Sequence, residues 1–471
     1  MKYRATTRLV IFLATILFVV SGTYLVVRYA KGDRWGKQGG IIGTGLLSAN
    51  SFPPAAEVYI NGKLTTATDN TLNLDPGQYQ VEIKKDGYHP WNKNITIAAE
   101  LVTPTNAQLF PTSPSLDPLT YTGAESVIPS GDGDHLAFTV ASASASAKNG
   151  LYIQDLTGSP ISLNKSARQI ARTDGGYDYT KATYTFSPNA SELLVAFPSG
   201  AHLLLDVTRF NDISALKDVT VRLSQILSEW ELEIARAERT RLIELPDFFQ
   251  SLATESGTLA NLYFSPDGEK LLYQSLTEQD VPTGLAPPLP ATSTQPETRH
   301  LTPGNWYVYD LKEDKNFLLA QSSVPSPSPS PTPKAKKPIA SPLPATATFT
   351  PVKLMLLSDL SPIPAELVSS ASAFKTLQKG VNLPQSIALF NAQYSPIFVT
   401  SVQWYPDSSH LILTSASDIR VMEYDGTNQN TLYAGPFDSK IVYPWPDGSR
   451  LITRIQFSPD TIPNLYTIKL K

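Results

Sequence analysis

The hydrophobic and polar positions in the later part of the chain repeat as a strand, a tight turn and a second strand. In the clearest copy, residues 263–273, aromatic and aliphatic runs flank the polar turn Ser-Pro-Asp-Gly. Pro266 fixes φ, the Asp267 side chain can bond its own backbone, and Gly268 accepts a positive φ. The turn Asp or Asn of the five copies stands at Asp132, Asn189, Asp267, Asp407 and Asp447. An internal repeat of this kind decides the architecture, so it is interpreted first.

The spacing of the copies favours a β-propeller over residues 119–471. The last two turns are 40 residues apart, which fits one four-stranded blade of roughly 40–50 residues. Larger gaps before positions 267 and 407 indicate insertions, and the second gap could hide a degenerate blade. We therefore expect five or six blades.

The repeat resembles a known family in its Phe-Ser-Pro-Asp-Gly turn, residues 264–268. This turn is similar to that of the TolB-type, WD-like β-propeller repeat, and the resemblance covers roughly residues 115–471. It implies the fold and says almost nothing of chemistry, because the residues that carry it form turns.

An uncharged apolar stretch occupies residues 9–27 near the N-terminus. Its nineteen residues just span a hydrocarbon core as a helix. We expect an uncleaved signal anchor, with a short tail at 1–8 and a tether at 28–43. The alternative is a cleaved signal peptide. Basic residues stand on both sides, so loop charge does not set the orientation, and export of the long C-terminal part is the simpler topology.

Residues 44–110 read as a compact all-β segment. The run at 57–60 leads into Asn61-Gly62, a strong hairpin signal, and 79–83 alternates as a strand. Several short motifs in this segment match those of one family. They lie at 53–56, 59–63, 74–79 and 85–88, with Trp91.

This segment resembles the PEGA domain, a small β-sandwich of bacterial and archaeal surface proteins. Pro-Pro-Ala-Ala at 53–56 departs from the Pro-Glu-Gly-Ala of the family name. The resemblance implies a surface location and a binding or spacer role, without catalytic residues. The whole chain is thus similar to membrane-anchored surface proteins that contain this domain. Residues 111–118 are interpreted as a linker to the propeller.

An amphipathic helical insertion is expected at residues 214–246. Its apolar stripe includes Leu223, Ile226 and Trp230, and Pro246 ends it. We expect the stripe to pack on the side or top of the propeller. The alternative is a partner-docking helix in which Trp230 is the anchor and Leu223 and Ile226 flank it.

Two Pro-rich insertions, 281–303 and 323–351, interrupt the repeat region. Neither carries enough apolar surface to form a core, so the composition predicts disordered surface loops.

The overall composition narrows the chemistry. Lys and Arg total 38 against 42 Asp and Glu, so the chain has no basic excess for nucleic acid. The absence of Cys from the sequence removes disulfides, thiolate catalysis and Cys-based zinc sites. The acidic turn at 174–178 lacks the rest of a calcium loop and reads as a plain turn.

The histidines give little sign of catalysis. His135 and His410 occupy the repeat position just after the turn, where other copies have Glu192, Lys270 and Arg450. A position that accepts such different residues is interpreted as a solvated strand entry. We predict no catalytic, cofactor or metal site.

These patterns lead to an all-β protein with one transmembrane helix, a PEGA-like sandwich and a propeller. The leading hypothesis is a single-pass, extracytoplasmic binding or scaffolding protein, at the cell surface or in a periplasm-like space. Its membrane segment is 9–27, and its partner is a protein or a cell-wall glycan rather than nucleic acid. The alternative is a propeller hydrolase or lyase with an active site in the central channel.

Overall fold

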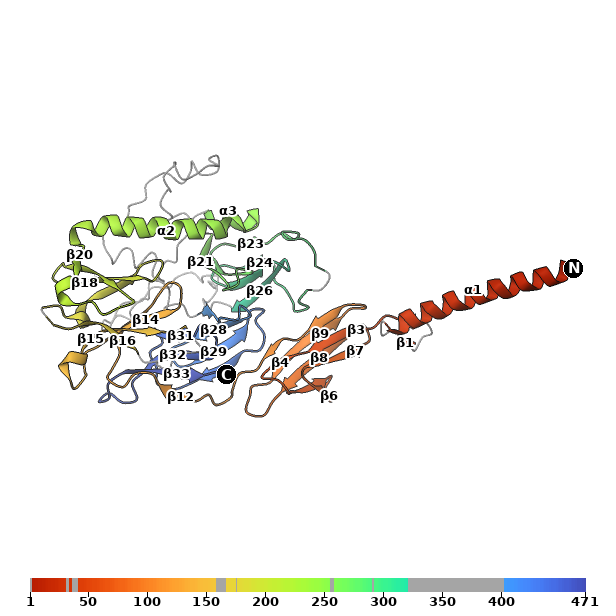
Figure 1. The fold of residues 1–471 in the computed structure, drawn as a ribbon, viewed down its shortest axis with the longest axis horizontal. Coiled ribbons are helices and arrows are strands. Elements are labelled where there is room, and N and C mark those ends of the chain that lie inside the picture. The colour runs from red at the N-terminus through yellow and green to blue at the C-terminus, as the bar shows by residue number, and fades with distance from the viewer. Residues whose placement is uncertain are drawn as a thin grey trace, which may run out of the picture. The chain divides into compact units, whose positions relative to one another are not determined.

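The computed structural model describes residues 2–30, 34–35, 41–157, 167–174, 176–254, 258–289, 292–320 and 402–471 (Figure 1). The chain divides into two compact units, which are described separately. The first unit comprises Met1–Ser113 and Pro288–Pro296, and the second comprises Pro114–Pro287 and Glu297–Lys471. The insertion expected at 323–351 lies outside the described residues.

The N-terminal apolar stretch forms helix α1, Lys2–Ala30. Its segment Val10–Arg28 has a mean hydropathy of 2.5, and none of it is buried in the protein. By length and composition this helix can cross a membrane, as a single-pass anchor or a signal sequence does. Two short strands follow and pair with each other, β1 (Arg34–Trp35) and β2 (Ile41–Ile42).

The rest of the first unit is a β-sandwich. One sheet has the order β6-β5-β8-β9, and a second has the order β10-β3-β7 beside the pair β11-β4. The first sheet consists of β6 (Lys63–Ala67), β5 (Glu57–Ile60), β8 (Gly77–Lys84) and β9 (Trp91–Ile97). The others are β10 (Val102–Pro104), β3 (Gly45–Ala49), β7 (Asn70–Leu74), β11 (Ala107–Gln108) and β4 (Ser51–Phe52).

The sandwich core follows from strand alternation. Val58, Val81, Ile83 and Trp91 are all buried in one cluster, while their sequence neighbours point outward. The Asn61-Gly62 pair turns β5 into β6 with positive φ at both residues, 50° and 77°. This is the geometry that the hairpin signal in the sequence predicts.

The second unit contains five four-stranded antiparallel sheets in its described residues. Blade I is β13 (Glu125–Pro129), β14 (His135–Val140), β15 (Gly150–Asp155) and β16 (Arg168–Arg172). Blade II is β17 (Thr183–Phe186), β18 (Glu192–Ala196), β19 (His202–Asp206) and β20 (Lys217–Asp218). Blade III is β21 (Leu259–Phe264), β22 (Lys270–Ser275), β25 (Trp306–Asp310) and β26 (Lys315–Ala320). Blade IV is β27 (Val402–Trp404), β28 (His410–Thr414), β29 (Ile419–Glu423) and β30 (Asn430–Tyr433).

Blade V joins the two ends of the repeat region. It consists of β31 (Val442–Pro444), β32 (Arg450–Ile455), β33 (Asn464–Lys469) and β12 (Leu116–Pro118). Leu116 pairs with Ile468 in antiparallel register, so a strand from the start of the region completes the last blade. Pairing first to last protects both free edges of the propeller. Leu116–Pro118, which the sequence analysis assigned to a linker, is therefore an outer strand.

Each recurring turn connects the first and second strands of its blade. In blade III, the Ser265 hydroxyl donates to Asp267, while the backbone N–H of Lys270 donates to Ser265 Oγ at 2.9 Å. Gly268 has φ 75°, as the turn requires. The Ser, Pro and Asp or Asn of the motif thus fix where the second strand begins.

The position just after the turn is not simply a solvated strand entry, as the sequence analysis proposed. Lys270 and His410 are both buried. Lys270 Nζ lies 3.9 Å from the carboxylate of Asp310, its cross-strand partner, and 4.8 Å from the centre of the Tyr424 ring in blade IV. His410 Nδ1 lies 2.7 Å from the Asp407 carboxylate. In blade III, the Tyr424 ring of the next blade covers this position and explains the burial of Lys270.

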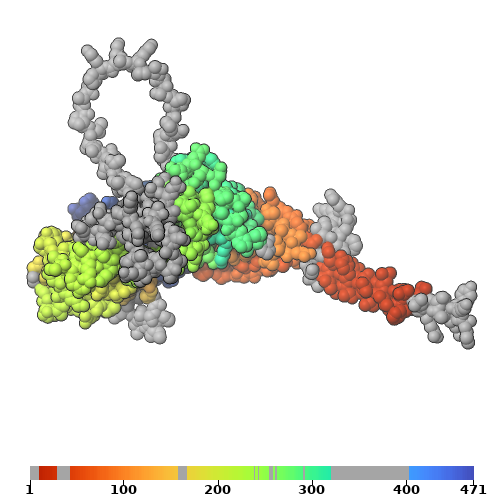
Figure 2. Space-filling model, turned by 90° about the horizontal axis from the view of Figure 1, so that it is seen from above, coloured from red at the N-terminus to blue at the C-terminus, as the bar shows by residue number. Residues whose placement is uncertain are grey.

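Helices occupy the space between blades II and III. The insertion expected at 214–246 contains α2 (Leu223–Ile243), and a second helix, α3 (Asp247–Thr254), follows Pro246 and lies beyond the predicted end. Short elements precede α2: the 3-10 turns η3 (Ile213–Ala215) and η4 (Thr220–Arg222), with β20 between them. Figure 1 shows the two helices in line, running from the β18–β20 side to the β21 side, and Figure 2 shows them in yellow-green and green.

The alternation of β18 shows which face α2 covers. Leu193 and Val195 pack with blade I, whereas Leu194 and Ala196 pack with α2. In blade III, Leu271 packs with Phe249 of α3, whereas Leu272 on the opposite face of the sheet packs with Leu411 of blade IV. The helices therefore cover the faces that blades II and III would otherwise turn toward each other. The expected position on the side or top of the propeller is thereby corrected.

Blades III and IV contact each other directly across the long gap in the repeat. Leu272 and Val308 of blade III share a core cluster with Val402 and Leu411 of blade IV. The part of that gap where the sequence could hide a degenerate blade, 321–401, lies outside the described residues.

The first Pro-rich insertion, 281–303, is ordered over its described residues rather than disordered. Val281 and Leu301 are buried in the core of blade III, and β23 (Gln279–Asp280) pairs with β24 (His300–Leu301). Arg299 donates to the carbonyl of Pro282 at 2.6 Å and forms an ion pair with Asp314 at 3.3 Å. The two buried apolar side chains and the contacts of Arg299 order this segment, and its composition alone did not predict that order.

Candidate binding site between the first and second blades

The three candidate docking residues of the sequence analysis lie on the buried side of α2. Leu223, Ile226 and Trp230 share a core cluster with Leu194 of blade II. They form the packing stripe of the helix, which is the other interpretation offered by the sequence. Partner docking by α2 stays a prediction, and it would have to use the opposite face of the helix.

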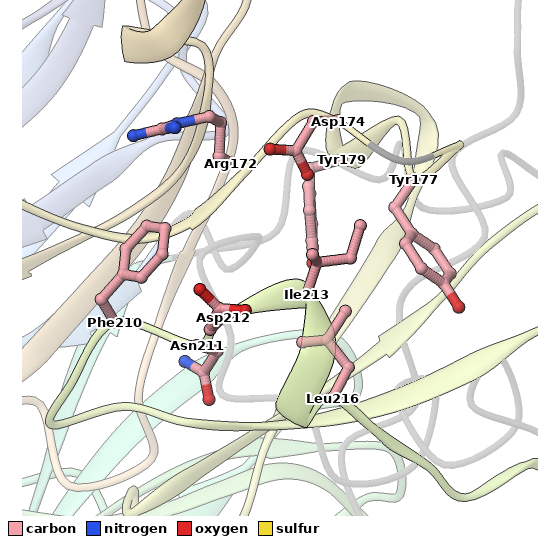
Figure 3. A pocket seen from close by; sticks show the side chains of 9 residues that line it. All are labelled: Arg172, Asp174, Tyr177, Tyr179, Phe210, Asn211, Asp212, Ile213 and Leu216. Atoms are coloured by element: carbon pink, nitrogen blue, oxygen red, sulfur yellow. The ribbon is translucent and has the colours of Figure 1, made fainter.

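A small pocket lies where blade I meets blade II (Figure 3). It has a volume of about 70 Å³. Blade I contributes the end of β16 and the turn after it, and blade II contributes the connection from β19 to β20. The lining residues are Arg172, Asp174, Tyr177, Tyr179, Phe210, Asn211, Asp212, Ile213 and Leu216.

Asn211 fixes the two walls of the pocket relative to each other. Its backbone N–H donates to the carbonyl of Ile170 in β16 at 2.7 Å, and its side-chain amide donates to the same carbonyl at 3.1 Å. The Asn211 side chain also accepts from the backbone N–H of Asp206 at 2.9 Å. Its hydrogen-bonding groups therefore hold the fold together.

Three charged side chains of the pocket have polar atoms without a hydrogen-bond partner among the residues that the structure describes. Arg172 donates from Nε to the carbonyl of Ala147 at 3.1 Å, and its two terminal nitrogens have no hydrogen bond to a described residue. Asp212 accepts both bonds from Ser214 on one oxygen, Oδ1. The carboxylate of Asp174 accepts none from the described residues. In Figure 3 the Asp174 and Asp212 carboxylates point into the gap from opposite sides.

Hydrogen bonds in the pocket favour the charged form of Asp212, and burial favours the neutral form of Tyr179. The side-chain and backbone hydrogen bonds from Ser214 lower the pKa of Asp212. Burial raises the pKa of the Tyr179 hydroxyl, as does the charge of Asp174. These shifts favour the carboxylate form of Asp212 and the neutral phenol of Tyr179.

Apolar side chains border the same pocket. Phe210 is 45% exposed and Ile213 is 46% exposed. The Arg172 guanidinium carbon lies 5.9 Å from the centre of the Phe210 ring. The opening thus combines an aromatic surface with charged hydrogen-bonding groups, a composition typical of small-ligand sites.

The sequence analysis missed this site. Its residues come from two blades and none belongs to the repeated turn. The one signal available was the acidic turn at 174–178, which does form a turn: the backbone N–H of Tyr177 donates to the carbonyl of Asp174 at 3.0 Å. Among the described residues, no group of three or more His, Asp or Glu side chains could hold a metal ion.

Comparison with known proteins identifies the first globular segment. Residues 44–113 match the PEGA domain family, so the sandwich of the first unit is a PEGA domain. No curated protein matches the chain.

Several solved structures are similar to the chain at low identity. A putative TolB from Agrobacterium tumefaciens is 12% identical, with 74% of this chain and 78% of that chain covered and a TM-score of 0.18. TolB from Acinetobacter baumannii is 11% identical, with coverage of 84% and 60% and a TM-score of 0.18. An oligogalacturonate lyase in complex with manganese is 10% identical, with coverage of 84% and 86% and a TM-score of 0.22. These scores are too low to bear on function.

Proposed function

We propose that the protein is a membrane-tethered, extracytoplasmic binding protein whose propeller presents a site to a protein or glycan of the cell envelope. The observation that carries this proposal is the pocket between blades I and II. It opens beside exposed Phe210 and Ile213, and Arg172, Asp174 and Asp212 bring polar atoms that have no hydrogen-bond partner in the described part of the chain. Unused polar groups beside an apolar surface support binding.

The order of the parts supports the tethered arrangement. An apolar helix precedes the PEGA domain, and the propeller follows it. In this proposal α1 stays in the membrane as an anchor, and the PEGA domain and the propeller both lie on the extracytoplasmic side. We found no feature of the described residues that specifically favours the enzyme alternative.

The absence of Cys from the sequence gives a direct test of topology. Single cysteines are placed at exposed positions, Thr65→Cys in the PEGA domain and Ser224→Cys in α2. A membrane-impermeant maleimide should label both in intact cells or, where an outer barrier exists, in spheroplasts. Labelling only after lysis would refute export. A third variant carries one extra Cys inserted between Met1 and Lys2, and the maleimide should label it only after lysis.

Binding is tested separately with the full-length protein in detergent. Envelope polymers from the host are stripped of membrane, mixed with the protein and sedimented. The proposal expects the protein in the pellet, saturably and in competition with unlabelled protein. If the labelled protein stays in the supernatant at every envelope concentration, the binding function is wrong.

A further inference from the structure

The charges around the pocket between blades I and II limit what it can bind. Asp174 and Asp212 supply two carboxylates against the single guanidinium of Arg172. A phosphate, sulfate or carboxylate ligand would meet net repulsion there. A purely apolar group would strip water from both carboxylates without replacing their hydrogen bonds, which is costly. A neutral ligand rich in hydrogen-bonding groups avoids both penalties.

Sugar hydroxyls match the unused atoms of the pocket. A hydroxyl both donates and accepts, and it can donate to the free oxygen of Asp212 or to the carboxylate of Asp174. Hydrogen bonds to charged partners are stronger than neutral ones. The exposed part of Phe210 offers an apolar surface for the C–H face of a ring.

The size of the pocket sets the extent of the contact. Its volume of about 70 Å³ is well below the roughly 300–1,000 Å³ of sites that enclose a whole small ligand. The pocket can therefore admit part of one sugar ring, and the rest of the ring lies outside it.

We infer that this pocket is a saccharide subsite, which holds one neutral sugar unit of a glycan. The inference rests on the proposed function and narrows its partner from a protein or glycan to a glycan. A basic peptide is the competing ligand, since two carboxylates attract a cation. The guanidinium of Arg172, already over Phe210, opposes a second cation in the same place.

The test uses full-length protein in a polyoxyethylene detergent, because sugar-based detergents would compete. Maltotriose, cellotriose, tri-N-acetylchitotriose and trilysine are titrated by calorimetry and by saturation-transfer NMR. The variants are Asp174→Asn, Asp212→Asn and Phe210→Ala. Asn at 212 can still cap η3, so this variant preserves the turn. The matched control is Asp460→Asn, an exposed carboxylate outside the pocket.

At least one trisaccharide should bind, and saturation transfer should place one ring on the protein. Each Asp→Asn change should weaken binding about tenfold, the loss of one charged hydrogen bond. Phe210→Ala should weaken it and Asp460→Asn should leave it unchanged. Binding of trilysine instead, no saccharide binding by folded protein, or equal loss in the control would overturn the inference. If the protein sediments with envelope and none of the saccharides inhibits this, the saccharide inference is wrong but the proposed binding function stands. If the protein does not sediment with envelope, the proposed function is wrong as well.

Discussion

The backbone N–H of Asp267 donates a hydrogen bond of 3.0 Å to the hydroxyl oxygen of Ser408. It joins the recurring turn of blade III to that of blade IV. These two turns thus have two roles, since each begins a strand in its own blade and contacts the neighbouring blade.

Ser408→Ala removes the acceptor from this bond and leaves the Asp267 N–H without its partner. We expect a loss of about 1 kcal/mol in the free energy of unfolding, measured by urea denaturation of the full-length protein in detergent. Ser224→Ala, at an exposed position of α2, is the control and should not destabilise the protein. Equal stability of the two variants would mean that the turn-to-turn bond contributes nothing.

Ring closure can be tested at Ile468, which is buried and pairs with Leu116. Ile468→Ala should cost about 2–5 kcal/mol. Hydrogen exchange should show faster opening at both the C-terminal strand and blade I, because β12 pairs with β33 and Ala124, just before β13, donates to the carbonyl of Pro463. Faster exchange confined to 464–469 would contradict closure through this strand.

The helices between blades II and III can be tested by comparing buried and exposed positions. Phe249 in α3 is buried against Tyr273 and Tyr309 of blade III, with ring centres 5.6 and 4.5 Å away. Phe249→Ala should cost about 3–5 kcal/mol. Ile243→Ala, at an exposed position near the end of α2, should change stability by less than about 0.5 kcal/mol. If both substitutions change stability by a similar amount, α3 is not part of the propeller core.

Acid should weaken blade IV through Asp407. Burial acts to raise the pKa of Asp407, but the hydrogen bond and charge of His410 and the backbone N–H groups of Ser409 and His410 outweigh it, so the pKa lies below its usual 3.8. A carboxylate with a lowered folded-state pKa stabilises the fold above its unfolded pKa and loses that effect as the pH falls through the folded value. Unfolding stability should thus decrease below about pH 4. Asp407→Asn should flatten this decrease relative to Asp460→Asn, and parallel pH profiles would contradict the role of Asp407.

The parts of the fold that the sequence predicts are those set by local signals. Asn61-Gly62 specifies its hairpin and Ser265–Gly268 specifies its turn through residue types alone. Leu116–Pro118 was missed because a three-residue strand containing Pro has no periodic signal, and only the partner strand β33 makes it a strand. The burial of His410 likewise depends on its tertiary neighbours.

The candidate site was harder to predict, for the same reason. Asp174 and Asp212 come from different blades, and the Asn211 bonds to Ile170 bring their loops together. Nothing in either local sequence encodes that contact. For Trp230 the sequence predicted part of the result. The amphipathic spacing of the helix correctly predicted a buried stripe, but it did not indicate that the stripe packs on blade II.

The central claim is that an envelope-facing propeller binds its partner through the pocket between blades I and II. The most direct measurement is sedimentation of full-length protein with host envelope polymers, for the double variant Asp174→Asn/Asp212→Asn and for Asp460→Asn. If each lost charged hydrogen bond costs tenfold, the double variant should need on the order of 100-fold more envelope for half-maximal binding. The control should bind like the unaltered protein. Unchanged binding of a correctly folded double variant would contradict the claim.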